Sequence, residues 1–203
     1  WVDQAVFCAV PYLIRDHEHL DKVADGPIGQ SIEDPLRSGA GLRPIAYFAR
    51  SARNLTSNRP IRHPDDLQGM VLRLPNDPMA IAVWQALGAK PTPMAFSEVF
   101  TALQQGTVEG QENPFALIES AAFYEVQKYC NLTEHTISWI YVVIGEQRFA
   151  SLPDDLQQIV LEAGREMQAY ERELFLEESA RLAKTLQERG MVFVPVDKEA
   201  FKQ

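Results

Sequence analysis

The feature that most constrains the fold is an alternation of strand-like and helix-like segments in the middle of the chain. Three short runs there have the length of strands: Met70–Leu74, Pro91–Met94 and Val108–Gln111. Helical patterns separate them, one capped by Asp77 and ending at Gly88, the next beginning at Phe96. Strands that alternate with helices favour parallel pairing with helices packed on the sheet faces. The sequence therefore predicts an α/β fold.

The flanking segments give further expectations of secondary structure. Strands are predicted at Leu42–Phe48, at Ile137–Ile144 and, before the chain ends, at Met191–Val196. Three other segments are a buried strand or turn at Val2–Ile14, a short helix at Ile32–Leu36 interrupted by Pro35, and a polar stretch without a clear period at Arg50–Asn58.

A long helix is predicted near the end of the chain. It opens at Pro153 and carries an apolar stripe in steps of four and three that continues to Leu186, before Gly190. The members of this stripe are Leu156, Val160, Ala163, Met167, Tyr170, Leu174, Leu182 and Leu186.

Charge and cysteine content exclude several classes of function. The net charge of -9 argues against a nucleic-acid surface or an anionic-membrane surface, because either needs a basic patch. Cys8 and Cys130 belong to no C-x-x-C or Cys/His arrangement, so neither a zinc site nor another metal or cofactor is predicted. The two cysteines are consistent with one disulfide or two buried thiols, and we favour the thiols.

Asn113 stands where the third strand meets a helix that Pro114 opens. An Asn in this place either caps the helix or turns its amide outward as a donor and acceptor for a ligand. Residue chemistry alone leaves both alternatives open.

Three stretches of the chain resemble one protein family. They are PTPMAFSEVFTALQQGTVEGQENP followed by FYEVQKY, the upstream RNLTSNRPIRHPDDLQGMVLRLPND and, more faintly, PYLIRDHEHLDKVADGPIG. The sequence is similar here to the substrate-binding proteins of tripartite ATP-independent periplasmic (TRAP) transporters, the DctP-type family. The resemblance covers most of the chain, and the central motif is long enough to be specific.

The resemblance implies a two-lobed periplasmic-binding-protein-like fold, with a long helix along both lobes and the ligand in the cleft between them. Residues 1–50 would be part of an incomplete lobe I, 51–112 mainly lobe II with crossing strands, and 113–203 the crossing segments and the long helix. Family members are longer, so we expect the chain to be incomplete at both ends.

Arg73 is the main candidate for ligand binding. It ends an apolar strand, so its side chain should emerge at the edge where open α/β folds place ligands, and its planar fork of donors matches a carboxylate. Such an Arg is otherwise a surface ion-pair partner more often than a ligand residue. In the family pattern the Arg of R-x-P after the DL-x-G turn is the principal carboxylate clamp, which favours binding here.

Five further ligand contacts are predicted: Arg53, Asn113, Phe96, Trp139 and Tyr141. The resemblance implies the first three, and the last two are predicted to line the pocket from their place on the strand Ile137–Ile144. Arg53 is equally consistent with a loop Arg exposed to water, and Phe96 with a core position. Trp139 and Tyr141 alternate on one face of a strand, where aromatic residues usually pack in cores.

The predicted function is that of a periplasmic receptor without catalytic residues. It would bind a small organic acid, such as a carboxylate, dicarboxylate or sugar acid, and deliver it to a TRAP membrane permease without inserting into the membrane itself. Two alternatives stay open: an enzyme that acts on a sugar acid through Glu109 and Glu112, and a sensor domain for the same ligands.

Overall fold

The computed structural model describes residues 2–203, without the side chains of residues 3, 4 and 176, and divides into two compact units. Unit 1 holds the described residues up to Cys8, together with Leu13–Arg50 and Ile137–Glu178. Unit 2 holds Ala9–Tyr12, Ser51–Thr136 and Ser179–Gln203. Each unit is therefore assembled from segments that are far apart in the sequence.

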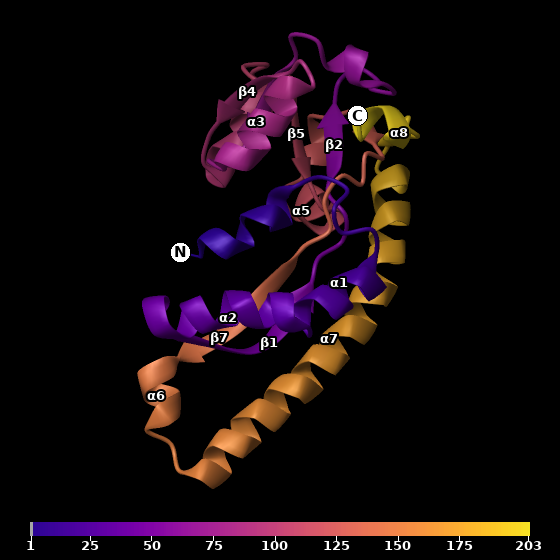
Figure 1. Cartoon of the computed structure of the whole chain (residues 1–203). Coiled ribbons are helices and arrows are strands. Elements are labelled where there is room, and N and C mark those ends of the chain that lie inside the picture. Colours follow the sequence, from indigo (N-terminus) through magenta and orange to yellow (C-terminus); the bar gives the residue numbers. More distant parts are fainter. Residues whose placement is uncertain (1) are drawn as a thin grey trace. The chain divides into compact units, whose positions relative to one another are not determined.

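Unit 1 is built on an antiparallel ribbon of two strands, β1 (Leu42–Ala49) and β7 (Trp139–Gly145). Helix α2 (Pro27–Ala40) runs beside β1, as Figure 1 shows. The remaining elements are the 3-10 helix η1 (Asp3–Ala9), helices α1 (His17–Ala24) and α6 (Glu146–Ala150), and the first part of α7 (Asp154–Glu188). A small core of Ile14, Leu20, Val23, Ala24 and Tyr47 lies among them.

Local signals place the first two helices of unit 1. The side chain of Asp16 accepts a hydrogen bond from His19 N at 2.7 Å and so caps α1. Helix α2 begins with Pro27 and is capped after Ala40 by Gly41, whose left-handed φ of 66° suits a residue without Cβ. Pro35 lies inside α2 without ending it.

Unit 2 contains a mixed sheet of six strands in the order β4-β3-β5-β2-β6-β8. The strands are β2 (Asn54–Ser57), β3 (Val71–Leu74), β4 (Lys90–Pro93), β5 (Gly110–Asn113), β6 (Tyr129–Asn131) and β8 (Val192–Val194). Strand β3 is parallel to β4 and β5, and β6 is parallel to β8. Strand β2 is antiparallel to both of its neighbours, β5 and β6.

Helices and 3-10 turns cover the sheet of unit 2. They are η2 (Pro64–Leu67), α3 (Pro78–Ala86), η3 (Phe96–Glu98), α4 (Val99–Gln104), α5 (Phe115–Ser120), η4 (Phe123–Glu125), α8 (Lys198–Phe201) and the last part of α7. Successive residues of β3 enter different cores, because side chains alternate along a strand. Leu72 packs with Trp84 of α3, whereas Val71 packs against the cluster that contains Val99 and Leu186.

The predicted α/β class and most of the predicted elements are confirmed. The series β3, α3, β4, α4 and β5 follows the expected alternation, and the long helix spans 35 residues as α7. No helix among residues 2–203 is both long and apolar enough to cross a lipid bilayer.

Two expectations of secondary structure were wrong, and two segments were only partly predicted. Of the strand or turn expected at Val2–Ile14 the structure has turns, together with the 3-10 helix η1, and no strand. The predicted short helix at Ile32–Leu36 is the longer α2. Arg50–Asn58 contains β2, which has no apolar alternation because all four of its residues are buried and three of them are polar. The chain does not end after its last strand, since α8 follows β8.

The two cysteines are free thiols, as favoured from the sequence. Cys130 is fully buried in unit 2, and Cys8 is half-buried. Burial raises the pKa of Cys130 to about 12 and that of Cys8 to about 11.

Candidate functional site

Arg73 lies in β3, where its neighbours in register are Thr92 of β4 and Gln111 of β5. Only 4% of the residue is exposed. Its guanidinium donates from Nη2 and Nε to one backbone oxygen, that of Met94, at 2.9 and 3.3 Å. The group also lies 5.8 Å from the centroid of the Phe96 ring. The Arg that the sequence singled out is thus buried against the sheet.

The charge of Arg73 lacks a direct partner among residues 2–203. Among the side chains that the structure describes, no carboxylate oxygen lies within 4.0 Å of its guanidinium, and Met94 O is its single hydrogen-bond acceptor. Burial lowers the pKa of Arg73. The negative charge of Glu112 opposes this shift, and the positive charge of Arg53 adds to it. Arg nevertheless stays protonated in proteins. A buried cation without an ion-pair partner is unfavourable, so the site is suited to an anion.

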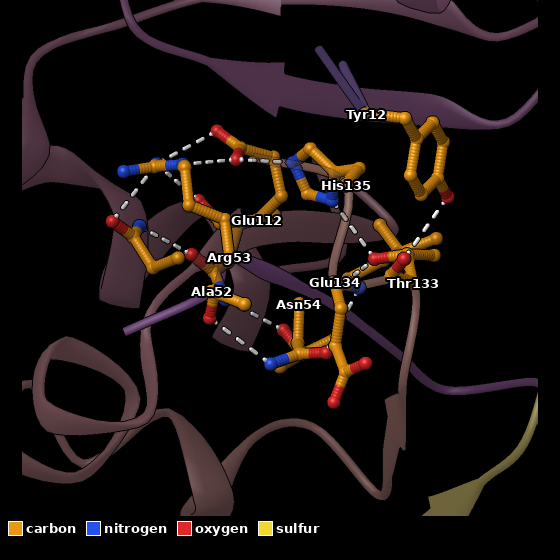
Figure 2. A network of polar contacts seen from close by, with 12 residues as sticks. Tyr12, Ala52, Arg53, Asn54, Glu112, Thr133, Glu134 and His135 are labelled. Carbon is orange, nitrogen blue, oxygen red and sulfur yellow. Dashed lines mark hydrogen bonds and ion pairs between the residues drawn. The ribbon is translucent and has the colours of Figure 1, made fainter. Parts of the chain in front are cut away.

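Arg53, by contrast, is already paired within the protein. Its Nε and Nη2 donate to the two carboxylate oxygens of Glu112 at 2.5 and 2.8 Å, and Nη2 also donates to the backbone oxygen of Glu112 at 2.8 Å. His135 Nε2 lies 3.0 Å from the same carboxylate, and it donates there because a carboxylate only accepts. Figure 2 shows the Glu112 carboxylate between Arg53 and His135.

Glu112 is held as a carboxylate despite its burial. Desolvation raises its pKa, but the Arg53 charge and the hydrogen bonds from His135 and Arg53 outweigh that effect and lower the pKa to about 2. The proton that a catalytic acid would have to donate is therefore absent at neutral pH. Glu109 lies elsewhere, exposed, with its carboxylate accepting from Val71 N at 2.8 Å.

His135 is fixed from several sides. Its Nδ1 lies 2.8 Å from the hydroxyl of Thr133, and its ring meets the edge of Trp84 with the centroids 5.0 Å apart. Tyr12 donates from its hydroxyl to the backbone oxygen of Thr133 at 2.9 Å, as Figure 2 shows. These contacts set the ring plane of His135 and thereby the position of the Glu112 carboxylate.

Asn113 neither caps the next helix nor stands free. The N-cap of α5 is Pro114, which has no side-chain hydrogen bond. The Asn113 amide instead accepts from Arg53 Nη2 at 3.0 Å and donates to Gln111 Oε1 at 2.6 Å. Two of the predicted ligand residues, Arg53 and Asn113, are therefore in direct contact.

Phe96 opens η3 and is 43% exposed, so it is not a core residue. Its ring meets Phe123 in an edge-to-face arrangement with the centroids 5.8 Å apart. The Arg73 guanidinium lies near the same ring. Phe96 is thus an exposed ring beside the buried guanidinium of Arg73.

Trp139 and Tyr141 belong to unit 1, where they lie on β7. Their rings meet edge-to-face with the centroids 6.2 Å apart, and Trp139 also contacts Phe7. The Tyr141 hydroxyl is buried and has no hydrogen-bond partner within residues 2–203, and burial raises its pKa to about 12. Both residues stay predicted ligand contacts, because their packing within unit 1 does not test whether they touch a ligand.

Residue types alone missed the roles of His135 and Gln111. His135 has no partner at a recognisable motif spacing, because Glu112 is 23 positions away. Gln111 adjoins the Glu-Asn pair in the motif, and that adjacency was the signal available. Among the described side chains, no group of three or more His, Cys, Asp and Glu residues could hold a metal ion.

Comparison with known proteins places this geometry in context. All residues from 1 to 203 match the family model DctP, described as bacterial extracellular solute-binding protein, family 7. A solute-binding protein of Roseobacter denitrificans is 54% identical over 202 residues, which cover 100% of this chain and 62% of the relative. The 2,3-diketo-L-gulonate-binding periplasmic protein YiaO of Escherichia coli is 38% identical over 194 residues, 95% of this chain and 59% of YiaO.

A solved structure shares the fold. The crystal structure of a TRAP periplasmic solute-binding protein from Roseobacter denitrificans with bound L-galactonate matches with a TM-score of 0.92 and 54% identity. The match covers 99% of this chain and 67% of that one. The chain thus spans about three fifths of the length of the curated relatives.

Proposed function

The chain belongs to the DctP family of bacterial extracellular solute-binding proteins, family 7, and from this premise we propose that it is the ligand-binding part of a receptor for a sugar acid. The relatives named above bind 2,3-diketo-L-gulonate or hold L-galactonate, and both molecules are sugar acids. The ligand of this chain would belong to the same class. We further propose that units 1 and 2 correspond to the two lobes predicted from the sequence.

The observation that carries the proposal is the buried charge of Arg73, which has no direct ion-pair partner among the described side chains. A buried cation costs free energy unless an anion compensates it, and the Glu112 carboxylate, which favours the charged form of Arg73, forms its ion pair with Arg53 instead. A ligand carboxylate would accept the guanidinium donors that Met94 leaves free, in the bidentate geometry that Arg favours. Phe96 would pack its exposed ring against the carbon chain of the ligand.

Arg53 and Asn113 have a supporting role in this proposal. The Arg53 guanidinium is committed to Glu112 and Asn113 through Nε and Nη2, so Nη1 is the nitrogen that it can offer to a ligand. Asn113 has one N–H and one oxygen lone pair beyond its present hydrogen bonds. Trp139 and Tyr141 would contribute aromatic contacts, and the Tyr141 hydroxyl a hydrogen bond.

The hypothesis of a receptor is favoured over the alternative hypothesis of an enzyme that acts on a sugar acid through Glu109 and Glu112. Glu112 is ionised and engaged by Arg53 and His135, and Glu109 is exposed and bonded to a backbone amide. An acid and base pair for glycoside hydrolysis needs one protonated carboxyl, which Glu112 does not provide. The proposed receptor returns its ligand unchanged. It would work in the periplasm and deliver the ligand to a TRAP-type permease.

Calorimetric titration with L-galactonate and related sugar acids tests the proposal. The Arg73→Met variant should lose roughly 2–5 kcal/mol of binding free energy, the usual loss when one partner of a buried charge pair is removed. Its stability without ligand should be unchanged or higher, because a buried unpaired cation is gone. Arg62→Ala, which removes an exposed Arg of the same unit, should bind like the wild type. Wild-type affinity in Arg73→Met would refute the proposal.

A further inference from the structure

A chain of side-chain hydrogen bonds runs through the sheet of unit 2 behind the candidate site. It begins where Arg53 Nη2 donates to Asn113 Oδ1 (3.0 Å) and Asn113 Nδ2 donates to Gln111 Oε1 (2.6 Å). Gln111 Nε2 then donates to Thr56 Oγ1 (2.8 Å), and Thr56 Oγ1 donates to Gln127 Oε1 (3.1 Å). It ends where Gln127 Nε2 donates to the backbone oxygens of Val126 (3.3 Å) and Glu109 (3.4 Å). The chain therefore joins β2 and β5 to the segment before β6.

Both ends of this chain impose the same direction. Arg53 can only donate, so Asn113 must turn its oxygen toward Arg53 and its nitrogen toward Gln111. At the other end backbone oxygens can only accept, so Gln127 must turn its nitrogen to them and its oxygen to Thr56. The Thr56 hydroxyl then donates to Gln127 and accepts from Gln111. Every amide in the chain consequently has one permitted orientation.

Burial makes this orientation hard to reverse. Asn113 and Gln127 are 3% and 1% exposed, and Gln111 and Thr56 are fully buried, so water does not replace a lost partner. If one side-chain amide were flipped by 180°, its nitrogen would face a donor on one side and its oxygen would face an acceptor on the other.

Gln111 occupies the central place in this arrangement. It lies opposite Thr56 on the antiparallel neighbour β2 and in register with Arg73 on the parallel neighbour β3. Its side chain leaves β5 on the same face as that of Asn113, two residues on. Gln111 thus connects the strand of the proposed carboxylate-binding Arg to the amide of Asn113.

We propose that Gln111 is a positioning residue that holds the Asn113 amide in the orientation in which its free N–H is donated to an oxygen of the bound sugar acid. This inference rests on the proposed function and deepens it, because it assigns a determinant of ligand recognition to a residue that does not itself touch the ligand. The short bond from Asn113 Nδ2 to Gln111 Oε1 leaves one N–H and one oxygen lone pair of Asn113 for the ligand.

Two variants interrupt this series of hydrogen bonds in the full-length protein. Gln111→Met keeps the length of the side chain but removes both hydrogen bonds, and Thr56→Val removes one buried hydroxyl without changing Gln111. We expect Gln111→Met to weaken L-galactonate binding at least tenfold and Thr56→Val several-fold. Ser57→Ala is the matched control, because it removes the buried hydroxyl of the next residue, which lies outside the chain. It should bind within twofold of the wild type.

The Asn113→Ala background separates positioning from a general structural effect. If Gln111 acts through Asn113, Gln111→Met should change the affinity of Asn113→Ala by less than twofold. The inference is overturned if Gln111→Met binds like the wild type, or if it weakens binding by the same factor in both backgrounds. Should Gln111→Met not fold, Thr56→Val is measured in the same two backgrounds.

An NMR readout keeps this inference distinct from the proposed function. The Asn113 Nδ2 proton bonded to Gln111 should resonate downfield in the ligand-free wild type and move upfield in Gln111→Met. If no sugar acid binds the wild type, the proposed function fails and the Asn113 signals alone decide the orientation. Unchanged Asn113 signals in Gln111→Met would then show that Gln111 does not set the orientation of the Asn113 amide.

Discussion

Arg53 donates two hydrogen bonds to the carboxylate of Glu112, from Nε at 2.5 Å and from Nη2 at 2.8 Å. The Glu112 side chain is 4% exposed, whereas the Arg53 side chain is 23% exposed. A charge-assisted pair of this geometry is among the strongest polar contacts in a protein, but it also places a charge where water does not reach. The stability of unit 2 should therefore depend on both partners and on pH.

The pH dependence follows from the lowered pKa of Glu112. A carboxyl group with a lower pKa in the folded protein stabilises the fold above its unfolded pKa, and this stabilisation disappears as the pH falls toward the folded pKa. As the pH falls from about 4.5 to about 2 and Glu112 becomes protonated, the free energy of unfolding should decrease by roughly 3 kcal/mol. Urea denaturation across this range measures the effect.

The Glu112→Gln variant isolates this contribution. It should be less stable than the wild type at pH 7 but should lose less stability on acidification. Glu162→Gln, which changes an exposed residue of α7, should follow the wild-type curve. Equal slopes for wild type and Glu112→Gln would contradict the assignment.

Removing one partner of the pair should be worse than removing both. Arg53→Met leaves the Glu112 carboxylate with His135 alone, and we expect a loss of about 3 kcal/mol in unfolding free energy. The double variant Arg53→Met/Glu112→Met buries no charge and should recover part of this loss. Urea denaturation at pH 7 compares the three proteins, and a double variant that is less stable than Arg53→Met would argue against the explanation.

Two helical glycines should respond in opposite ways to alanine. A Cβ on Gly164 of α7 would lie 2.2 Å from the backbone oxygen of Ile45, so Gly164→Ala must separate the helix from β1. We expect a loss of about 1–3 kcal/mol, the usual range for overpacking. A Cβ on Gly39 of α2 meets nothing within 4 Å, so Gly39→Ala should stabilise by up to about 1 kcal/mol through helix propensity.

Thermal unfolding of both variants checks this contrast. An increase in Tm for Gly164→Ala would show that α7 and β1 do not approach as closely as described. A decrease for Gly39→Ala would show that this glycine has a partner.

The thiols should react slowly in the folded protein. Burial raises the pKa of both Cys8 and Cys130, so the reactive thiolate is scarce at pH 8, and Cys130 is also inaccessible. A disulfide-exchange reagent should titrate two thiols in denaturant and almost none without it. Cys8, which is half-buried, should be the first to react as denaturant is added. Fast native labelling of Cys130 would be inconsistent with its burial.

The sequence by itself determined the elements whose signals are local. The stripe from Leu156 to Leu186 predicts α7 because helical spacing is visible within a few turns, and Asp77 marks the start of α3 because a cap acts on the next residues. The motif around Arg73 and Asn113 likewise indicated where polar groups collect, since Asn113 ends β5 and Arg73 lies one residue before the end of β3.

Only the tertiary structure decided which polar groups meet. Arg53 and Glu112 are 59 positions apart in the chain, and they pair because β2 enters the sheet antiparallel to β5, a register that no local pattern of polar residues predicts. The same pairing directs the Asn113 amide to Arg53 and Gln111 instead of the helix that follows it. Burial then makes these contacts compulsory, because a buried polar group must find its partner within the fold, and only the packed sheet determines which partner is within reach.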